Sequence, residues 1–450
     1  MSTAARTPPG PPQNLIINGA ARFFRIPLNR YLIDNFVRYG DTVGFRFLNF
    51  PFYLISHPAG VEHVLHTNSE NYVKASINYG FLKKLFGERL ITSDGPNWRR
   101  QRRIIQPAFQ RAYTGNLGPL ITNATIDMLR PWQGRSPAEA FDLVPELSRL
   151  TSRIFGLAFL GADLSRHAAS IAKASAAANQ YFGQFNLNRF FPFLPTWLSL
   201  KSRFAVHALR RVANELINRW TCSGSGGDDF LSVLVRACYP ASGRELLRQL
   251  QDHLVTFILA GHETSATALT WICYLLARHP KVEKRLRAEL ADVLDGKTAT
   301  ISDLPLLPFS RMVIEESVRL YPPAWFISRS ALEDDIVGGY KIPKGSLLIL
   351  SPYVTHRHPA FWPEPERFDP ARFHPAHAKC RPRFAYFPFG GGPRSCIGTS
   401  FAMAELHLIL VTITQHYHLE VDPLQQVQEQ ALVTLRPRHA IKVTAHAIKT

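Results

Sequence analysis

Apolar residues recur every three or four positions over much of the chain, which predicts a largely helical protein. The first such stretch spans residues 29–39. The pattern returns near residue 95 and continues to about residue 325, with one interruption at the polar, glycine-rich residues 223–229. Within it, residues 244–279 are expected to form a single helix about 50 Å long.

Alternating apolar and polar residues predict short strands near both ends of the chain. Residues 42–55 have the pattern of a hairpin, and residues 335–350 hold short strands separated by Gly and Pro turns. Three further strands are expected at residues 418–422, 431–435 and 440–446. Because segments from both ends must meet in one β region, we predict a mainly α fold with a small β-sheet region in a single intertwined domain.

The composition is that of a folded protein without a membrane anchor. The 450 residues are 46% hydrophobic and 19% charged, which excludes a mostly disordered chain. Residues 1–20 are polar, rich in proline and without the apolar core of a signal peptide, so we expect an extended arm before a folded domain over residues 21–450. The longest apolar region, residues 254–277, contains Glu263, which a bilayer span would hardly tolerate. Five widely spaced cysteines without zinc-site spacing favour a reducing compartment, so we expect a cytoplasmic location.

The charge is strongly unbalanced. The chain carries 52 Lys and Arg against 34 Asp and Glu, a formal net charge of +18. Such an excess attracts nucleic acid, anionic membrane or an acidic protein partner. Nucleic-acid binding is disfavoured because the sequence lacks a recognised nucleic-acid-binding motif and a platform of alternating aromatic and basic residues.

One segment near the carboxyl end combines glycine, arginine and cysteine. Phe389, Gly392, Arg394, Cys396 and Gly398 fit the pattern FxxGxRxCxG, and a helix is expected to begin after the cysteine. Glycines let the backbone approach a flat cofactor, and the positive start of a helix stabilises a thiolate. A thiolate held in this way is a suitable axial ligand for haem iron. A buried structural cysteine is the alternative, and the surrounding glycines and arginine weigh against it.

With this segment the sequence resembles the cytochrome P450 family of haem-thiolate monooxygenases, from about residue 28 to the carboxyl terminus. The resemblance implies the P450 fold, haem b (iron protoporphyrin IX) bound through the thiolate of Cys396, dioxygen as co-substrate, and a soluble enzyme of bacterial type. Phe389, Arg394 and Gly398 are then expected around the haem.

The resemblance also implies a buried ion network that holds the chain on the haem side of the fold. Glu316 and Arg319 stand one turn apart in an ExxR pair, on a helix that Pro322 and Pro323 end. In the family the arginine of a PERF segment joins this pair, and here we expect that residue to be Arg367. By itself an ExxR pair would be an ordinary surface pair worth about 0.3–0.5 kcal/mol.

The segment AGHETSA lies inside the long predicted helix and matches the family pattern Ala/Gly-Gly-x-Asp/Glu-Thr. Thr264 can bond back to the carbonyl of Ala260 and bend the helix. Gly261 removes a side chain where something flat lies close, so Ala260 and Gly261 are expected to contact the haem. Glu263 and Thr264 form an acid–alcohol pair suited to relaying protons to dioxygen, and we expect them to be the catalytic residues. The alternative is a threonine satisfied by its own backbone beside a solvated glutamate.

Three arginines are expected to bind the haem propionates. Trp98 and Arg102 stand four residues apart on one helical face, a WxxxR pair that the family uses for this purpose. A guanidinium binds a carboxylate through two parallel hydrogen bonds. The resemblance implies the same role for Arg329 and Arg394. A solvated basic helix face is the alternative for Trp98 and Arg102.

The resemblance gives part of the excess charge a place, on the thiolate side of the haem where the electron donor docks. The cations of this face are Arg99, Arg100, Arg103, Lys379, Arg381 and Arg383. A basic face attracts an acidic ferredoxin or flavodoxin. The chain shows no flavin or iron–sulfur domain of its own, so we expect a monomer that receives electrons from NAD(P)H through a separate donor and its reductase.

The substrate pocket of this family is built from scattered loops. The candidates for its lining are Phe81, Phe86, Phe185, Ala260, Trp325, Phe326, Ile327 and Val433. An apolar lining suits a hydrophobic molecule, best a terpenoid or a fatty acid, with oxygen inserted into a C–H or C=C bond. The aromatic residues 182–197 form either a core cluster or a lid that touches a membrane peripherally, and both interpretations stay open.

Two other activities fit the same motifs less well. A peroxygenase that consumes hydrogen peroxide is expected to lack the acid–alcohol pair. A non-catalytic haem protein needs a second protein ligand to iron, and the neighbouring candidate, His262, is offset by one residue from Gly261.

Overall fold

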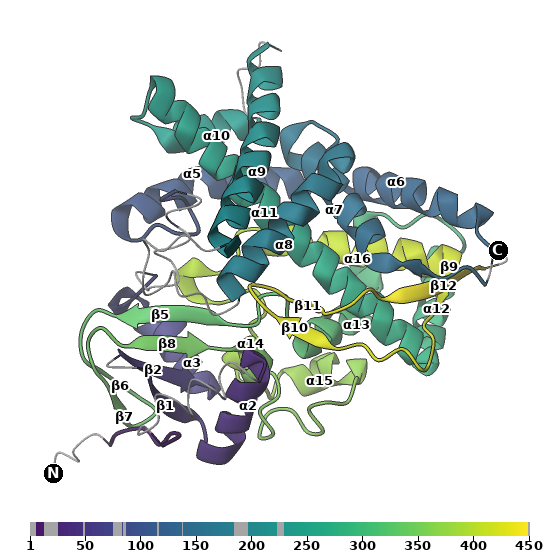
Figure 1. The fold of residues 1–450 in the computed structure, drawn as a ribbon. Coiled ribbons are helices and arrows are strands. Elements are labelled where there is room, and N and C mark those ends of the chain that lie inside the picture. The colour runs from purple at the N-terminus through teal and green to yellow at the C-terminus, as the bar shows by residue number, and fades with distance from the viewer. Residues whose placement is uncertain are drawn as a thin grey trace.

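Helices make up most of the computed structural model of this protein, and the largest sheet lies to one side of them, near the amino terminus (Figure 1). The structure describes residues 6–12, 26–47, 50–74, 83, 87–114, 117–136, 138–183, 197–222 and 229–448. This arrangement confirms the predicted mainly α fold with a small β region in a single domain.

The predicted helices are present. The helix expected over residues 29–39 is α2 (Leu28–Tyr39), the long helix is α11 (Gly243–Arg278), and the helix after the cysteine loop is α16 (Thr399–His416). The other α-helices are α3 (Pro58–Glu62), α5 (Gly95–Thr114), α6 (Leu117–Leu129), α7 (Leu143–Leu160), α8 (Ala168–Gly183), α9 (Trp197–Cys222), α10 (Phe230–Cys238), α12 (Pro280–Leu294), α13 (Pro308–Leu320), α14 (Pro352–Thr355) and α15 (Pro375–Ala378). Short turns of other helix types near the site are η1 (His63–Thr67), η7 (Pro370–Phe373), η8 (Arg383–Ala385) and η9 (Gly392–Arg394).

Segments far apart in the sequence pair in the largest sheet, whose order is β1-β2-β8-β5-β3. The predicted hairpin is β1 (Thr42–Phe47) and β2 (Phe50–Ile55), with Val43 opposite Leu54. β2 then pairs in parallel with β8 (Leu347–Leu350), so the two ends of the chain meet as expected. The other strands are β3 (Tyr72–Val73), β4 (Phe141–Asp142), β5 (Ile327–Ala331), β6 (Asp335–Val337), β7 (Tyr340–Ile342), β9 (Tyr417–Glu420), β10 (Glu429–Ala431), β11 (Leu435–Pro437) and β12 (Lys442–Ala447).

One strand prediction near the carboxyl end is wrong. Residues 431–435 do not form a single strand, because β10 ends at Ala431 and β11 begins at Leu435. Between them the backbone N–H of Leu432 donates to the carbonyl of Thr434 (3.1 Å), which reverses the chain. The apolar run therefore contains a turn, and this turn carries residues of the site.

The central helix of the fold is α11, which packs against α7, α9, α13 and α16 (Figure 1). Its side chains Leu254, Leu269 and Ile272 are completely buried. Burial of each such side chain stabilises the fold by about 1.5–3 kcal/mol, so α11 is a rigid support for the residues it carries. Across the described part of the chain, no helix combines the length and apolar character that a bilayer span requires.

The helix that carries the expected ExxR pair, α13, has its ends set by local chemistry. Pro308 occupies its first turn, where the missing N–H costs nothing. The carboxylate of Glu289 in α12 accepts from the free N–H groups of Phe309 and Ser310 (2.6 and 2.8 Å). The helix ends at Leu320, two residues before Pro322-Pro323.

Residues 6–12 of the expected amino-terminal arm lie against the edge of the β region. The N–H of Gly44 in β1 donates to the carbonyl of Pro9 (2.8 Å), and the N–H of Lys341 in β7 donates to the carbonyl of Arg6 (3.1 Å). A Cβ atom on Gly10 would lie 1.8 Å from the carbonyl oxygen of Gly44. Only glycine permits this close approach, so the arm is docked on β1 at a defined place.

Candidate active site

Cys396 lies in a tight loop directly before α16. Its backbone N–H donates to the carbonyl of Phe389 (2.8 Å), which closes the loop. Its carbonyl accepts from the hydroxyl of Thr399, the first residue of α16 (3.0 Å). Phe389 and Gly398 are half-buried on either side of the cysteine. The predicted position of the cysteine at a helix start is therefore confirmed.

Two glycines allow this loop to pack against its neighbours. A Cβ atom on Gly391 would lie 2.2 Å from the ring of Phe384 in η8. Gly392 has a φ of 64°, and its Cβ would lie 1.8 Å from the carbonyl oxygen of Leu65 in η1. Gly398 is less constrained, because its Cβ would meet only an ordinary contact 3.6 Å away.

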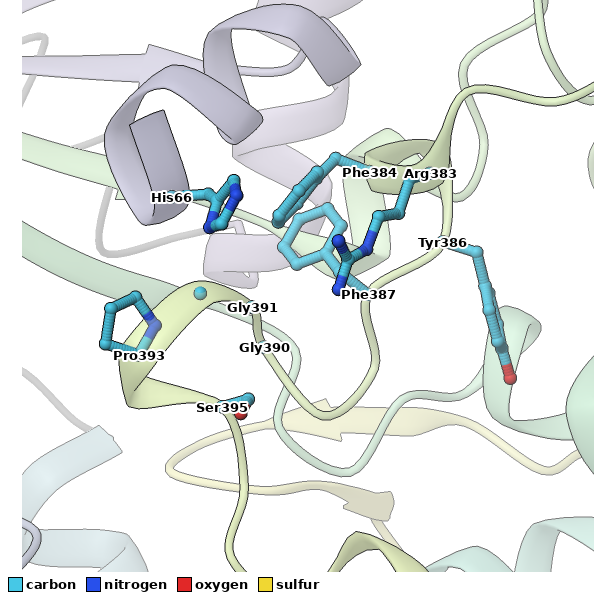
Figure 2. A pocket seen from close by; sticks show the side chains of 10 residues that line it. His66, Arg383, Phe384, Tyr386, Phe387, Gly390, Gly391, Pro393 and Ser395 are labelled. Atoms are coloured by element: carbon cyan, nitrogen blue, oxygen red, sulfur yellow. The ribbon is translucent and has the colours of Figure 1, made fainter. Parts of the chain in front are cut away.

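A cavity of about 260 Å³ adjoins this loop, as Figure 2 shows. His66 of η1 and Phe384 of η8 lie on one side of it, and the loop residues Gly391, Pro393 and Ser395 lie on the other. Arg383 extends toward the space from η8 (Figure 2). The predicted docking cation Arg383 therefore lies next to the cysteine loop.

The surroundings of Cys396 shift its thiol pKa in two directions. Cys396 is exposed, yet the protein atoms packed around its loop displace enough water from the sulfur to raise its pKa. The backbone N–H of Gly398, the hydroxyl of Thr399 and the guanidinium of Arg102 act in the opposite direction and favour the thiolate. These three groups are the ones that would stabilise an anionic sulfur ligand.

The charges of the predicted propionate ligands Arg102, Arg329 and Arg394 all act on one half-buried lysine, Lys74. Burial lowers the pKa of Lys74 well below its usual value, and the three arginines lower it further. Asp94 opposes them, and it accepts a hydrogen bond from Arg394 (2.6 Å). Three guanidinium groups and one lysine amine thus act on a region where one carboxylate offsets their charge. This donor set fits a group with two carboxylates, as haem has.

Each of these arginines is held in place by the backbone or by an aromatic ring. Arg102 donates to the carbonyl of Ser395 beside the cysteine (2.8 Å). Arg394 donates to the carbonyl of Ser93 (2.8 Å), and its guanidinium lies 3.8 Å from the centre of the Trp98 ring. Trp98 therefore orients Arg394, a contact that the WxxxR spacing did not predict.

The sequence does not single out Lys74. It follows β3, which pairs with β5 so that Val73 faces Ser330, the neighbour of Arg329. Arg329 is almost completely buried and donates to the carbonyl of Ser328 (2.9 Å). This pairing joins residues about 250 positions apart, and no local pattern announces it.

On α11 the predicted bond between Thr264 and Ala260 is present, with the hydroxyl donating to the carbonyl over 2.8 Å. The structure gives the missing side chain of Gly261 a packing role, and the contact of Gly261 with the haem stays a prediction. A Cβ atom on Gly261 would lie 2.4 Å from the ring of Phe155, so the glycine lets α11 approach α7 closely. Its missing side chain serves packing between the two helices.

Glu263 is held by two hydrogen bonds from other elements. Its Oε1 accepts from the amide of Asn179 in α8 and from the hydroxyl of Thr434 in the turn between β10 and β11 (2.9 Å). The neighbouring His262 is buried, its Nδ1 bonds to the carbonyl of Ile258 (2.9 Å), and burial lowers its pKa. The ring of His262 thus sits in the protein interior, which argues against a role as an iron ligand.

The expected ion network is completely buried at its centre. Arg319 donates to both carboxylate oxygens of Glu316 (2.6 and 2.9 Å) and to the carbonyls of His356 and Pro365 (both 2.8 Å). Neither Glu316 nor Arg319 has accessible surface. Because a buried ion pair is costly unless its polar atoms are satisfied, these carbonyl partners are essential to it.

The prediction that the side chain of Arg367 joins this network is wrong. Arg367 is exposed and pairs with Glu364 (3.0 Å), while Arg372 of η7 donates to Glu316 (3.1 Å). Arg367 contributes its backbone carbonyl, which accepts from Arg319 and Arg372. A second Pro-x-Arg-Phe pattern, residues 370–373, is the sequence signal that locates the true member.

A buried carboxyl group, which the sequence did not indicate as part of the site, lies between α16 and α11. Glu405 of α16 has no accessible surface and accepts from the hydroxyl of Ser265, next to Thr264 (2.5 Å). Burial raises the pKa of Glu405 to about 8, so it is largely protonated at neutral pH. The contact fixes α16, which follows the cysteine loop, to the helix that carries Thr264.

The structure places the predicted substrate-pocket residues in different surroundings. Phe81, Phe86 and Phe185 lie outside the described residues. Trp325 is 1% exposed and donates to the carbonyl of Leu432 (2.8 Å), so it belongs to the core and its prediction as a pocket residue is wrong. Ala260, Phe326 and Ile327 are half-buried, and Val433 is exposed in the turn between β10 and β11. These four remain candidates for contact with a substrate.

Comparison with known proteins defines the class. The family model described as "Cytochrome P450" matches residues 8–444. Cyclooctatin synthase of Streptomyces melanosporofaciens is 34% identical over 91% of this chain and 88% of its own. Pentalenene oxygenase of Streptomyces avermitilis is 32% identical over 96% and 95%. A human ultra-long-chain fatty acid omega-hydroxylase is 28% identical over 87% and 78%.

The chain therefore belongs to the cytochrome P450 family, and it is a haem-thiolate monooxygenase that uses dioxygen. Members of this family normally receive electrons from redox partner proteins. Cys396, with the cations around Lys74, matches the chemistry that the haem of this family needs.

Proposed function

We propose that Cys396 binds the haem iron and that Arg102, Arg329, Arg394 and Lys74 hold the two propionates. The observation that carries this proposal is the set of three arginines and one lysine offset by a single carboxylate, next to a cysteine at a helix start. When bound, the haem supplies the iron at which dioxygen is reduced and one oxygen atom passes to the substrate. Trp98 would keep the Arg394 guanidinium in position during binding.

The residues of α11 would then deliver the protons that this reaction consumes. Hydroxylation takes up dioxygen, two electrons and two protons and yields the alcohol and water. Thr264 offers a hydroxyl fixed to the Ala260 carbonyl, and Glu263 offers a carboxylate that exchanges protons with solvent because it is only half-buried. The presence of this acid–alcohol pair favours electron-driven oxygen activation over the use of hydrogen peroxide.

For the substrate we propose a terpenoid, with fatty acids as the second class. Two of the relatives described above oxidise terpenoids: one is named for the oxygenation of pentalenene and the other for the synthesis of cyclooctatin. Both are more similar to this chain than the fatty-acid hydroxylase is. The side chains of Ala260, Phe326, Ile327 and Val433 bear no charge, so they offer no partner to a carboxylate. An uncharged hydrocarbon skeleton suits this lining better than a fatty acid does.

For the electron donor we propose an acidic ferredoxin or flavodoxin, reduced by a separate NAD(P)H-dependent reductase. Arg99 and Arg383 are exposed, and Arg383 lies beside the cysteine loop (Figure 2). The net charge of +18 would steer an acidic donor to such a face with a strong dependence on salt. We place the reaction in the cytoplasm, where such donors occur.

The test begins with purified holoprotein. The reduced carbon monoxide adduct should show the red-shifted Soret band of thiolate ligation, and Cys396→Ser should abolish it while the fold persists by circular dichroism. Titration with pentalenene, palmitic acid and testosterone should give the largest low-spin to high-spin shift with the terpene. A larger shift with palmitic acid would overturn the terpenoid assignment, and an unshifted Soret band would overturn the haem site.

A further inference from the structure

One buried amide joins the catalytic acid to two other elements. Asn179 of α8 is 2% exposed, and its amide nitrogen donates to Oε1 of Glu263. Its amide oxygen accepts from the backbone N–H groups of Val433 and Thr434 (both 3.1 Å). The hydroxyl of Thr434 donates to the same oxygen of Glu263 (2.9 Å). Both ends of the amide are therefore in use, and each end contacts a different element.

This arrangement restricts how Glu263 can turn. Within the described part of the chain, the hydrogen bonds to its carboxylate all end on Oε1. The other oxygen, Oε2, is left to exchange a proton with water or a neighbouring group. A glutamate without such partners samples many rotamers, so two fixed donors confine the carboxylate to one orientation.

Among the described residues, the two charged or titratable groups that sense Glu263 make their own hydrogen bonds to other residues. Arg436 of β11 and His262 of α11 feel its negative charge, which raises the pKa of both, while burial lowers them. The hydrogen bonds found for Arg436 go to Gln430, and the ring of His262 bonds to Ile258. The orientation of the carboxylate is thus set by Asn179 and Thr434.

We propose that Asn179 is a positioning residue, which acts through Glu263 on the delivery of protons. Through Asn179 this delivery depends on the contact of α8 with the turn at residues 432–434. The inference rests on the proposed role of Glu263 as proton relay. If α8 and the turn separate, the Glu263 carboxylate loses both donors at once, because one side chain holds the turn and the acid together. Proton delivery would then be efficient only when the two elements are closed together.

The loss of positioning has a defined chemical outcome. Productive turnover consumes one dioxygen, two electrons and two protons per alcohol and water formed. When protons arrive incorrectly, the same dioxygen and two electrons are released with two protons as hydrogen peroxide. The ratio of product to peroxide therefore reports the delivery step, independently of how much haem the protein holds.

The experiment compares Asn179→Leu with Ser175→Ala in the holoenzyme, driven by a surrogate ferredoxin, its reductase and NADPH. Ser175 is a matched control because it lies one turn earlier in α8 and is 4% exposed, and its hydroxyl finds no hydrogen-bond partner among the residues that the structure describes. The probe is whichever of pentalenene, palmitic acid and testosterone gives the largest spin shift. We expect Asn179→Leu to lower product per dioxygen consumed by about tenfold with peroxide rising to match, and Ser175→Ala to change it less than twofold.

A double mutant separates positioning from a general structural effect. In the Glu263→Gln background, Asn179→Leu should cause no further loss, because the group it positions is already gone. An added loss of the full size would overturn the proposal, as would normal coupling in Asn179→Leu itself. If Glu263→Gln is fully coupled, the relay assignment fails rather than the Asn179 contact.

Thr434→Val provides a second variant should Asn179→Leu fail to fold. It removes one donor to Glu263 but keeps the two backbone bonds that hold the turn on Asn179. We expect product per dioxygen to fall about threefold at unchanged haem content. Normal coupling in this folded variant would overturn the proposal that these donors set the carboxylate.

Discussion

Replacement of Arg372 by alanine should weaken the segment that precedes the cysteine loop. The guanidinium of Arg372 donates to Glu316 (3.1 Å) and to the carbonyls of Pro363, Glu364 and Arg367 (2.8, 3.1 and 3.3 Å). Glu316 keeps its two bonds from Arg319, so an unpaired buried charge does not arise. The loss is then that of three carbonyl partners and one carboxylate contact, about 3–4 kcal/mol at about 1 kcal/mol each.

The matched control is Arg367→Ala. Arg367 is 63% exposed and pairs with an exposed glutamate, so its loss should cost less than about 0.5 kcal/mol. Urea unfolding of the two holoproteins, followed by far-UV circular dichroism and by the Soret band, measures the difference. Equal destabilisation of the two variants, or a larger effect for Arg367→Ala, would refute the assignment of Arg372 to the network.

Three further changes test other parts of the site. Gly261→Ala should cost about 1–3 kcal/mol in thermal unfolding because its Cβ meets the Phe155 ring, and Phe155→Leu in the same chain should restore part of the loss; no rescue would exclude this contact as the cause. Burial raises the pKa of Glu405 in the folded state to about 8, above the roughly 4.3 of a glutamate in the unfolded chain. Between these two values the folded state binds one proton more than the unfolded state, so the free energy of unfolding should fall as pH rises from about 4.5 to 8. Glu405→Gln should flatten this dependence in urea unfolding at pH 5, 6.5 and 8, and an unchanged slope would contradict it. Lys74→Met should speed haem transfer to apomyoglobin several-fold, whereas an unchanged rate would remove Lys74 from the binding site.

The parts of the site that could be predicted are those encoded within one short segment. The cysteine loop, the Glu316–Arg319 pair and the Thr264–Ala260 bond all lie within a few residues on one loop or helix. Helical periodicity located α11 to within one residue at each end, because a central helix shows a long, uninterrupted pattern. Local chemistry of this kind does not depend on how distant segments meet.

The parts that could not be predicted depend on contacts between distant segments. Lys74 reaches the arginines only through the pairing of β3 with β5, and Asn179 reaches Glu263 only through the packing of α8 on α11. Trp325 was misplaced because an aromatic residue beside the expected pocket can face either way, and its bond to Leu432 fixes it in the core. The prediction for Arg367 was wrong because Arg367 and Arg372, five residues apart, each stand in a Pro-x-Arg-Phe pattern. Only the fold decides which of the two side chains is buried beside Glu316.

The docked amino-terminal arm has a consequence for how this enzyme is handled. β1 is the edge strand of the largest sheet, and the carbonyl of Pro9 accepts from its Gly44 N–H. An uncovered edge strand is a template for pairing with another molecule. Proteolysis within residues 6–12 should therefore leave catalysis intact at first but promote sheet-to-sheet aggregation, so clipped preparations should show a growing high-molecular-weight fraction on gel filtration.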